Sequence, residues 1–133
     1  ITERTLAEIN RDFYDVIIMN YANADMVGHT GVMDASVQAI KILDECLAKV
    51  VRQVLAKGGV ALITADHGNA EHMLYENGEV DVSHGFDPVR FYFVGLDGKI
   101  EDGGLKDVAP TILEIMGISK PVEMTGESLI VNE

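Results

Sequence analysis

The stretch MDASVQAIKILDECLAKVVRQVLAKGGVALITADHGN, residues 33–69, decides the fold of this 133-residue chain. Its first part predicts a helix from Met33 to Lys57, because apolar side chains recur with the period of one helical face. The residues of this apolar face are Val37, Ile40, Leu43, Leu47, Val50, Val51 and Val54. A glycine pair then ends the helix, and Val60–Thr64 follows as a short apolar run. Such a run, bounded by glycine and polar residues, is typical of a strand buried on both faces.

A second apolar run lies upstream of this helix. Val16–Met19, in DVIIMNY, has the continuous apolar pattern of another buried strand. The polar, glycine-containing stretch ANADMVGHTG, residues 22–31, is interpreted as the loop that leads into the helix. Strand, helix and strand in this order predict a right-handed βαβ unit and a parallel sheet.

The rest of the chain adds short elements. We expect a helix in TERTLAEINRDF, strands near Val80–Val82 and Arg90–Val94, and a helix over Val108–Met116. A doubly wound α/β fold normally has five strands or more, so these strands are expected to be part of a larger sheet. The chain begins at Ile1 rather than at methionine, which leads us to expect further sequence upstream.

Composition excludes several classes of protein. Acidic residues number 22 against 10 Lys and Arg, for a net charge of −12. This balance argues against a nucleic-acid binder and against binding to an anionic membrane surface, since both need a basic patch. A hydrophobic fraction of 47% argues against disorder. No apolar run approaches the length of a membrane span, no signal sequence is visible, and the single cysteine, Cys46, fits a reducing compartment.

Aspartates and histidines follow the predicted strands. Asp25 and His29 come after the first apolar run, Asp66 and His67 after the second, and His84 shortly before the Arg90–Val94 strand. In open α/β sheets, sites form at the carboxyl ends of the strands, so these five side chains are expected to share one edge. Carboxylate oxygens and imidazole nitrogens without thiolates suit Mn or Zn better than Mg. The sequence therefore predicts a divalent-metal site.

Other polar residues are weaker candidates. Glu71 and His72 lie beside Asp66-His67 and are interpreted as exposed loop residues. A serine hydrolase is disfavoured, because no G-x-S-x-G motif is present. Ser83 and His84 are neighbours in an extended stretch, where adjacent side chains point to opposite sides.

Five stretches of the chain resemble one enzyme family. They are NYANADMVGHTG (20–31), ADHGNAE (65–71), SHGFDPVRF (83–91) and VAPTILEIMGI (108–118) with MTGESL (124–129). Together they resemble cofactor-independent (2,3-bisphosphoglycerate-independent) phosphoglycerate mutase, of the alkaline phosphatase superfamily. The resemblance implies a three-layer αβα fold with a mostly parallel sheet, of which this chain holds only a part.

The resemblance also implies a chemistry. Enzymes of this family interconvert 3-phosphoglycerate and 2-phosphoglycerate through a phosphoserine intermediate, in glycolysis and gluconeogenesis, in the cytoplasm. They use two divalent ions, usually Mn, with Zn or Co possible. By motif, Asp25, His29 and His84 resemble the ligands of one ion, and Asp66 and His67 resemble two of the ligands of the other.

The family's nucleophilic serine, its first metal-binding aspartate and its substrate domain lie upstream of the matched region. We therefore expect residues 1–133 to be the C-terminal part of the metal-binding phosphatase-like domain. The isolated chain is expected to be inactive, to hold at most one ion tightly and to self-associate through an exposed sheet edge.

Two alternatives remain open. In the first, the chain is a stand-alone, non-catalytic metal-binding or interaction module. In the second, it is a fragment of a related phosphomutase such as phosphopentomutase. The DMVGHTG stretch argues against the phosphopentomutase alternative.

Overall fold

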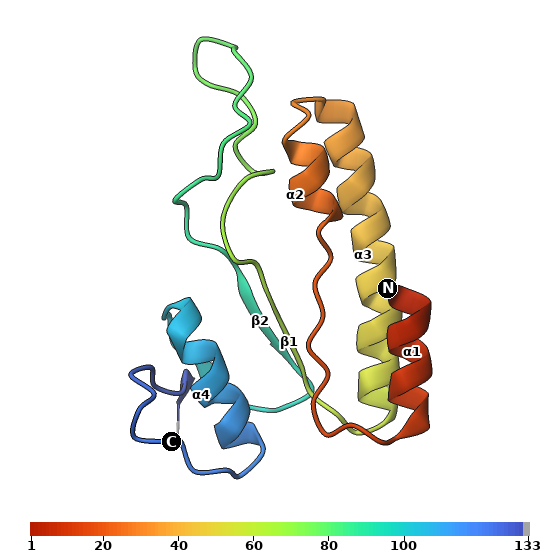
Figure 1. The fold of residues 1–133 in the computed structure, drawn as a ribbon, viewed down its shortest axis with the longest axis vertical. Coiled ribbons are helices and arrows are strands. Elements are labelled where there is room, and N and C mark those ends of the chain that lie inside the picture. Colours follow the sequence, from red (N-terminus) through yellow and green to blue (C-terminus); the bar gives the residue numbers. More distant parts are fainter. Residues whose placement is uncertain (132–133) are drawn as a thin grey trace. The chain divides into compact units, whose positions relative to one another are not determined.

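The computed structural model describes residues 1–131, which form two compact units. In the first unit, Ile1–Gly95, the helix α3 (Met33–Ala56) is the longest element. The helices α1 (Thr2–Arg11) and α2 (Asn23–Gly28) both pack against it, α2 beside its first half and α1 beside its second (Figure 1). The amide of Asn23 donates to the Ala39 carbonyl at 3.3 Å, which fixes α2 on α3.

The structure confirms the helix predicted from Met33 and its end at the glycine pair. Gly58 has a φ of 71°, the left-handed conformation that glycine adopts without strain. The Gly58 N–H donates to the Leu55 carbonyl and the Gly59 N–H to the Val54 carbonyl, both at 3.0 Å. These bonds satisfy carbonyls that the last helical turn leaves without partners.

The strand pairing differs from the expectation. β1 (Ala61–Thr64) pairs with β2 (Phe91–Val94) in antiparallel register, with Ala61 opposite Val94. Within residues 1–131 every pairing of named strands is antiparallel, so the predicted parallel βαβ unit is wrong for this part of the chain. Val16–Met19 has no ladder partner there, and Ile18 is 85% exposed. An apolar run becomes a strand only when a neighbour supplies its backbone hydrogen bonds.

The stretch predicted to be a loop at residues 22–31 contains α2. This helix is short and carries Asn, Asp and Gly, residues of low helix propensity, which is why the sequence pattern missed it. It matters for the site, because α2 carries Asp25 and ends at His29.

A long excursion, residues 65–90, connects β1 to β2. It contains a narrow hairpin in which Leu74 and Val80 form an isolated bridge and Gly78 turns the chain at a φ of 83°. Closer in sequence to β1 and β2, Gly68 and Gly85 form a second bridge, with the Gly85 N–H donating to the Gly68 carbonyl at 2.7 Å. This second bridge brings the segment after β1 against the segment that precedes β2.

The second unit begins at Leu96 and contains β3 (Lys99–Ile100), α4 (Leu105–Ile115) and β4 (Ile130–Val131). The helix predicted near Val108–Met116 is confirmed, but it begins earlier, so Pro110 lies inside it rather than in its first turn. β3 and β4 pair antiparallel.

Few apolar side chains are fully buried. Ala39, Val50 and Met73 are the buried apolar residues of the described first unit, and Leu129 is that of the second. Large apolar groups such as Phe13, Ile18 and Phe86 are mostly exposed. Among residues 1–131, no helix has the length and apolar character that crossing a membrane requires.

Candidate metal centre

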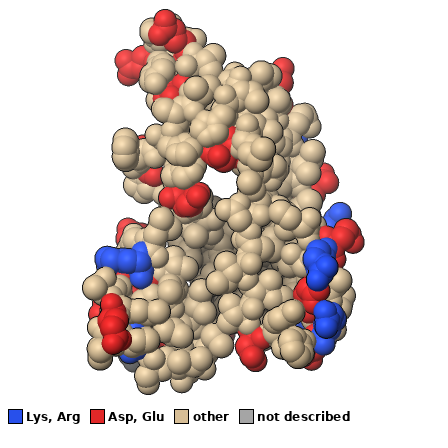
Figure 2. Space-filling model, viewed as in Figure 1, with Lys and Arg blue, Asp and Glu red and all other residues tan. Residues whose placement is uncertain are grey.

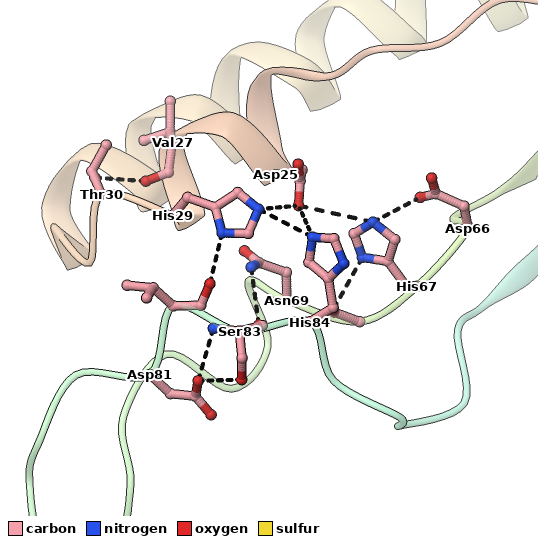
Figure 3. A network of polar contacts seen from close by, with 12 residues as sticks. Asp25, Val27, His29, Thr30, Asp66, His67, Asn69, Asp81, Ser83 and His84 are labelled. Carbon is pink, nitrogen blue, oxygen red and sulfur yellow. Dashed lines mark hydrogen bonds and ion pairs between the residues drawn. The ribbon is translucent and has the colours of Figure 1, made fainter.

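Three side chains from two distant segments meet at one point. Asp25 and His29 lie one helical turn apart at α2, and His84 comes from the excursion between β1 and β2 (Figure 3). One ligand-type atom from each of the three lies within 4.8 Å of the others. The D-x-x-x-H spacing explains why Asp25 and His29 lie close together, since residues i and i+4 share one face of a helix.

The distances between the three atoms are nearly equal. His29 Nε2 lies 3.2 Å from Asp25 Oδ1, His84 Nε2 lies 3.3 Å from the same oxygen, and the two nitrogens are 3.1 Å apart. Ligand atoms held on one ion at about 2.0–2.2 Å lie about 2.8–3.6 Å from one another for octahedral to tetrahedral angles. The triangle therefore has the dimensions of one face of a coordination sphere.

The hydrogen of His29 can be placed. Its Nδ1 lies 2.6 Å from the carbonyl oxygen of Val82, and a carbonyl can only accept a hydrogen bond. Nδ1 therefore carries a hydrogen, and in the neutral ring Nε2 presents a lone pair to Asp25 and His84. This arrangement, with the outer nitrogen donating to a carbonyl, is the usual way in which a protein orients a metal-binding imidazole.

The surroundings of Asp25 Oδ1 show whether the triad suits a metal ion. This atom is buried and has no hydrogen-bond donor among residues 1–131. In the neutral ring the His29 nitrogen beside it bears a lone pair, and the contact of 3.2 Å then joins two electron-rich atoms. A divalent cation between them turns this repulsion into attraction, and the triad therefore fits such an ion.

The other predicted pair is arranged differently. The Asp66 side chain is 70% exposed, and its Oδ1 lies 3.7 Å from Nε2 of its neighbour, His67. His67 Nε2 lies 3.9 Å from Asp25 Oδ1, outside the tight triangle. The His67 ring stacks on that of His84, with ring centroids 3.7 Å apart. The structure thus brings His67 to the edge of the triad and places the exposed Asp66 carboxylate beyond His67.

Asp66, His67 and His84 line one open pocket, together with Phe86, Asp87 and Val89. The pocket has a volume of about 560 Å³, enough for a small molecule. Phe86 is fully exposed at its rim.

Two residues that the sequence interpretation left aside support the site. The side-chain amide of Asn69 donates to the Ser83 carbonyl at 3.2 Å, one residue before His84. A Cβ on Gly28, in α2, would clash with the Asn69 amide oxygen, so Asn69 packs closely on the helix that carries Asp25. Glu71 orients Asn69 in turn by accepting its backbone N–H at 3.0 Å.

Asp81 is the other residue that was missed. Its buried carboxylate accepts the backbone N–H of Ser83 at 2.9 Å and the Ser83 hydroxyl at 2.5 Å. That hydroxyl, followed by the Ser83 N–H, lowers the pKa of Asp81 from its ordinary value. The D-x-S pattern was the available signal, because aspartate often accepts the backbone N–H two residues ahead. His72, interpreted as a loop residue, is half exposed and lies 3.3 Å from the other oxygen of Asp81.

The surroundings of the site carry negative charge. Figure 2 shows acidic side chains and no basic ones at the tip of the hairpin formed by residues 73–81. With a net charge of −12, the chain attracts cations from solution.

The comparisons with known proteins agree with this chemistry. The chain is 56% identical to a 2,3-bisphosphoglycerate-independent phosphoglycerate mutase of Acetivibrio thermocellus, over 98% of this chain and 26% of the relative. It is 50% identical to a protein of Methanosarcina barkeri named 2,3-bisphosphoglycerate-independent phosphoglycerate mutase 2, over the whole chain and 26% of that protein. The chain thus spans about a quarter of the length of these relatives.

A solved structure matches as well. The crystal structure of Leishmania mexicana phosphoglycerate mutase at low cobalt concentration superimposes with a TM-score of 0.88 and 32% identity, over 99% of this chain and 28% of that one. The likeness confirms the expected α/β fold of the alkaline phosphatase type, although the strands described above pair antiparallel. A model of the metalloenzyme superfamily matches residues 1–120, and the chain therefore belongs to the metalloenzyme superfamily.

Proposed function

We propose that this chain supplies much of the divalent-metal centre of a cofactor-independent phosphoglycerate mutase, as the C-terminal part of its metal-binding domain. Asp25, His29 and His84 hold one ion. Asp66 and His67 are two of the ligands of a second ion, whose remaining ligands come from outside residues 1–133. The observation that carries the proposal is the triangle of 3.1, 3.2 and 3.3 Å around the buried Asp25 oxygen, together with 56% identity to a mutase.

The assigned reaction interconverts 3-phosphoglycerate and 2-phosphoglycerate through a phosphoserine, as a step of glycolysis and gluconeogenesis in the cytoplasm. When bound, the two ions neutralise phosphoryl oxygens and lower the pKa of the attacking hydroxyl. The preferred ion is Mn, with Zn or Co as substitutes, because the donors are oxygen and imidazole nitrogen.

The residues of the chain have two tasks in this function. The Val82 carbonyl holds the hydrogen of His29 on Nδ1, which keeps Nε2 free as a donor atom. The pocket beside His84 gives a phosphorylated substrate room next to that atom. The nucleophile is assigned to another part of the enzyme, and the two hydroxyls next to the ligands in sequence, those of Ser83 and Thr30, donate to Asp81 and to the Val27 carbonyl.

Metal binding tests the proposed ion site of Asp25, His29 and His84. Calorimetric titration of the 133-residue chain with Mn²⁺ at pH 7.5 is expected to give one tight site per chain. His29→Ala should weaken that site by at least about tenfold, since it removes a direct ligand. Lys57→Ala, which changes an exposed residue at the end of α3, is the control. Two equal tight sites, or an unchanged His29→Ala variant, would show that the ligand assignment is wrong.

A chimaera tests whether the chain supports phosphoglycerate mutase activity as part of a whole enzyme. The 133 residues replace the matching segment of the Acetivibrio thermocellus relative, to which they are 56% identical. The folded chimaera is expected to convert 3-phosphoglycerate in a coupled assay with Mn²⁺, and the same chimaera with His29→Ala is expected to be inactive. The isolated chain should show no turnover above that of its His29→Ala variant. A folded, Mn-binding chimaera without mutase activity would favour the stand-alone module instead.

A further inference from the structure

The segment Val82-Ser83-His84 has two roles at the metal centre at once. The Val82 carbonyl accepts the Nδ1 hydrogen of His29 at 2.6 Å and so sets the orientation of that ring. Two residues later, His84 places its own Nε2 at 3.1 Å from that of His29 (Figure 3). A shift of this segment along its own axis would therefore disturb two ligands of one ion together.

Ser83, which lies between Val82 and His84, is hydrogen-bonded to Asp81. The Asp81 carboxylate accepts both the backbone N–H of Ser83, at 2.9 Å, and its hydroxyl, at 2.5 Å. Asp81 is itself fixed, because its backbone N–H donates to the Met73 carbonyl at 2.9 Å. At 7% exposure the carboxylate is shielded from water that would otherwise compete for these donors.

Other contacts hold the segment from different directions. Asn69 donates to the Ser83 carbonyl, and the side chains of Val80 and Val82 cover Gly31, where a Cβ would clash with Val80. These contacts fix how close the segment lies to α2. Asp81 bonds the Ser83 N–H, and the direction of this bond fixes the turn that separates the Val82 carbonyl from the His84 side chain.

We propose that Asp81 is a positioning residue of the metal centre, acting through Ser83 to hold the Val82 carbonyl and the His84 ring in the arrangement that the ion requires. This inference rests on the metal site of the proposed function. It assigns Asp81 no contact with the ion.

A second explanation is possible for any acidic residue near a cation, namely that its charge alone favours binding. The two explanations separate on the variant Asp81→Asn. Asparagine keeps an oxygen that accepts the Ser83 N–H and hydroxyl, but it removes the charge. Positioning predicts that Asp81→Asn resembles the wild-type chain, whereas a field effect predicts that it resembles Asp81→Ala.

The experiment is a set of Mn²⁺ titrations by calorimetry on the 133-residue chain and its variants. Asp81→Ala is expected to raise the Kd for Mn²⁺ by about tenfold or more, the usual effect of losing an outer partner of a ligand. Asp81→Asn is expected to stay within about threefold of the wild type, since its hydrogen bonds remain. Glu76→Ala, which removes an exposed carboxylate from the same hairpin, is the matched control and should leave the Kd unchanged.

A second readout separates positioning from general support of the fold. The ¹⁵N chemical shifts of the His29 ring report which nitrogen carries the hydrogen. In the wild type and in Asp81→Asn the hydrogen is expected on Nδ1, and in folded Asp81→Ala a mixture of the two tautomers is expected. If Asp81→Ala does not fold, Ser83→Ala replaces it, because it removes only the 2.5 Å contact and should raise the Kd by about fivefold.

The outcomes are distinct. A wild-type chain that binds no Mn²⁺ overturns the metal site and this inference together. A wild-type chain that binds Mn²⁺ while Asp81→Ala, or Ser83→Ala in its place, binds equally well overturns the inference alone. Equal weakening in Asp81→Asn and Asp81→Ala overturns positioning in favour of charge.

Discussion

The two Asp–His pairs of this chain look alike in the sequence and differ in the structure. Asp25 and His29 lie one turn apart at a helix, and their ligand-type atoms are 3.2 Å apart in a partly buried site. Asp66 and His67 are adjacent after a strand, with the Asp66 side chain 70% exposed and its carboxylate turned toward His67 (Figure 3). Helical spacing places Asp25 and His29 on one face, whereas Asp66 and His67 follow each other in a bend after β1, with Oδ1 and Nε2 3.7 Å apart. This difference supports the proposal that the first pair holds an ion within this chain and that the second depends on groups from elsewhere.

The largest expected effect compares the two aspartates. Asp25→Ala should abolish tight Mn²⁺ binding, because it removes the carboxylate oxygen around which the triad converges. Asp66→Ala should leave binding within about threefold, since it removes only an exposed charge. Calorimetric titration of both variants, with Asp44→Ala on the exposed surface of α3 as a control, measures the difference. Greater sensitivity to Asp66 than to Asp25 would reverse the comparison.

A smaller effect is expected where α2 meets the segment that carries His84. Gly28→Ala places a methyl group against the Asn69 amide oxygen and should displace the amide from the Ser83 carbonyl. We expect a loss of about 1–3 kcal/mol in the free energy of unfolding, as for other overpacked sites. The variant should also bind Mn²⁺ more weakly. Denaturant unfolding followed by titration checks both, and unchanged values would show that Asn69 does not link the two segments.

The second unit contains a buried carboxylate, Asp107, which differs from that of Asp25 because both of its oxygens accept hydrogen bonds. Asp107 accepts the Lys106 ammonium at 2.8 Å, the Gly104 N–H at 2.8 Å and the Glu127 N–H at 2.9 Å. The Lys106 contact first, then the two N–H groups, lower the pKa of Asp107 to about 2. Since the carboxyl of the unfolded chain binds its proton at higher pH than the folded one, this stabilisation is complete above about pH 4 and is lost as the pH falls toward 2.

Hydrogen exchange of the Leu129 amide, which donates to Thr111 within this unit, reports the effect locally. Protection in the wild type should decrease between about pH 4 and pH 2, after correction for the intrinsic exchange rate. Asp107→Asn should show lower protection at pH 5 and a flatter dependence on pH. A wild-type profile as flat as that of the variant would contradict the pairing.

The smallest expected effect concerns the apolar surface. Ile18 is 85% exposed, on the segment Val16–Met19 that the sequence predicts to be a covered strand, and the nearby Phe13 is 71% exposed. We expect the chain to self-associate at about 100 μM, where exposed apolar surface normally aggregates. Light scattering should show less association for Ile18→Ser. A monodisperse wild-type monomer at that concentration would count against this expectation.

The sequence predicted the parts that are determined by local pattern. The helix from Met33 and the strands near Val60–Thr64 and Arg90–Val94 follow from periodicity and glycine punctuation, and they are confirmed within a few residues. The strand at Val16–Met19 failed, because a strand requires a partner that no local pattern can supply. The short helix α2 failed because six residues are too few to show a period.

The site was predictable to a similar degree. Ligand chemistry and spacing selected five candidates, and the family resemblance grouped three of them, Asp25, His29 and His84, on one ion. The structure brings these three together. The contacts that hold them were not visible in the sequence. Val82 contributes a backbone carbonyl, which any residue has, and Asn69 and Asp81 act through hydrogen bonds to Ser83 that depend on the folded excursion.

The most direct test of the account is a crystal structure of the chain grown with Mn²⁺, with diffraction recorded at the manganese absorption edge. The account predicts one strong anomalous peak at bonding distance from Asp25 Oδ1, His29 Nε2 and His84 Nε2, with the Val82 carbonyl still accepting the Nδ1 hydrogen of His29. A peak on Asp66 and His67 with the triad empty, or no peak at either place, would contradict it.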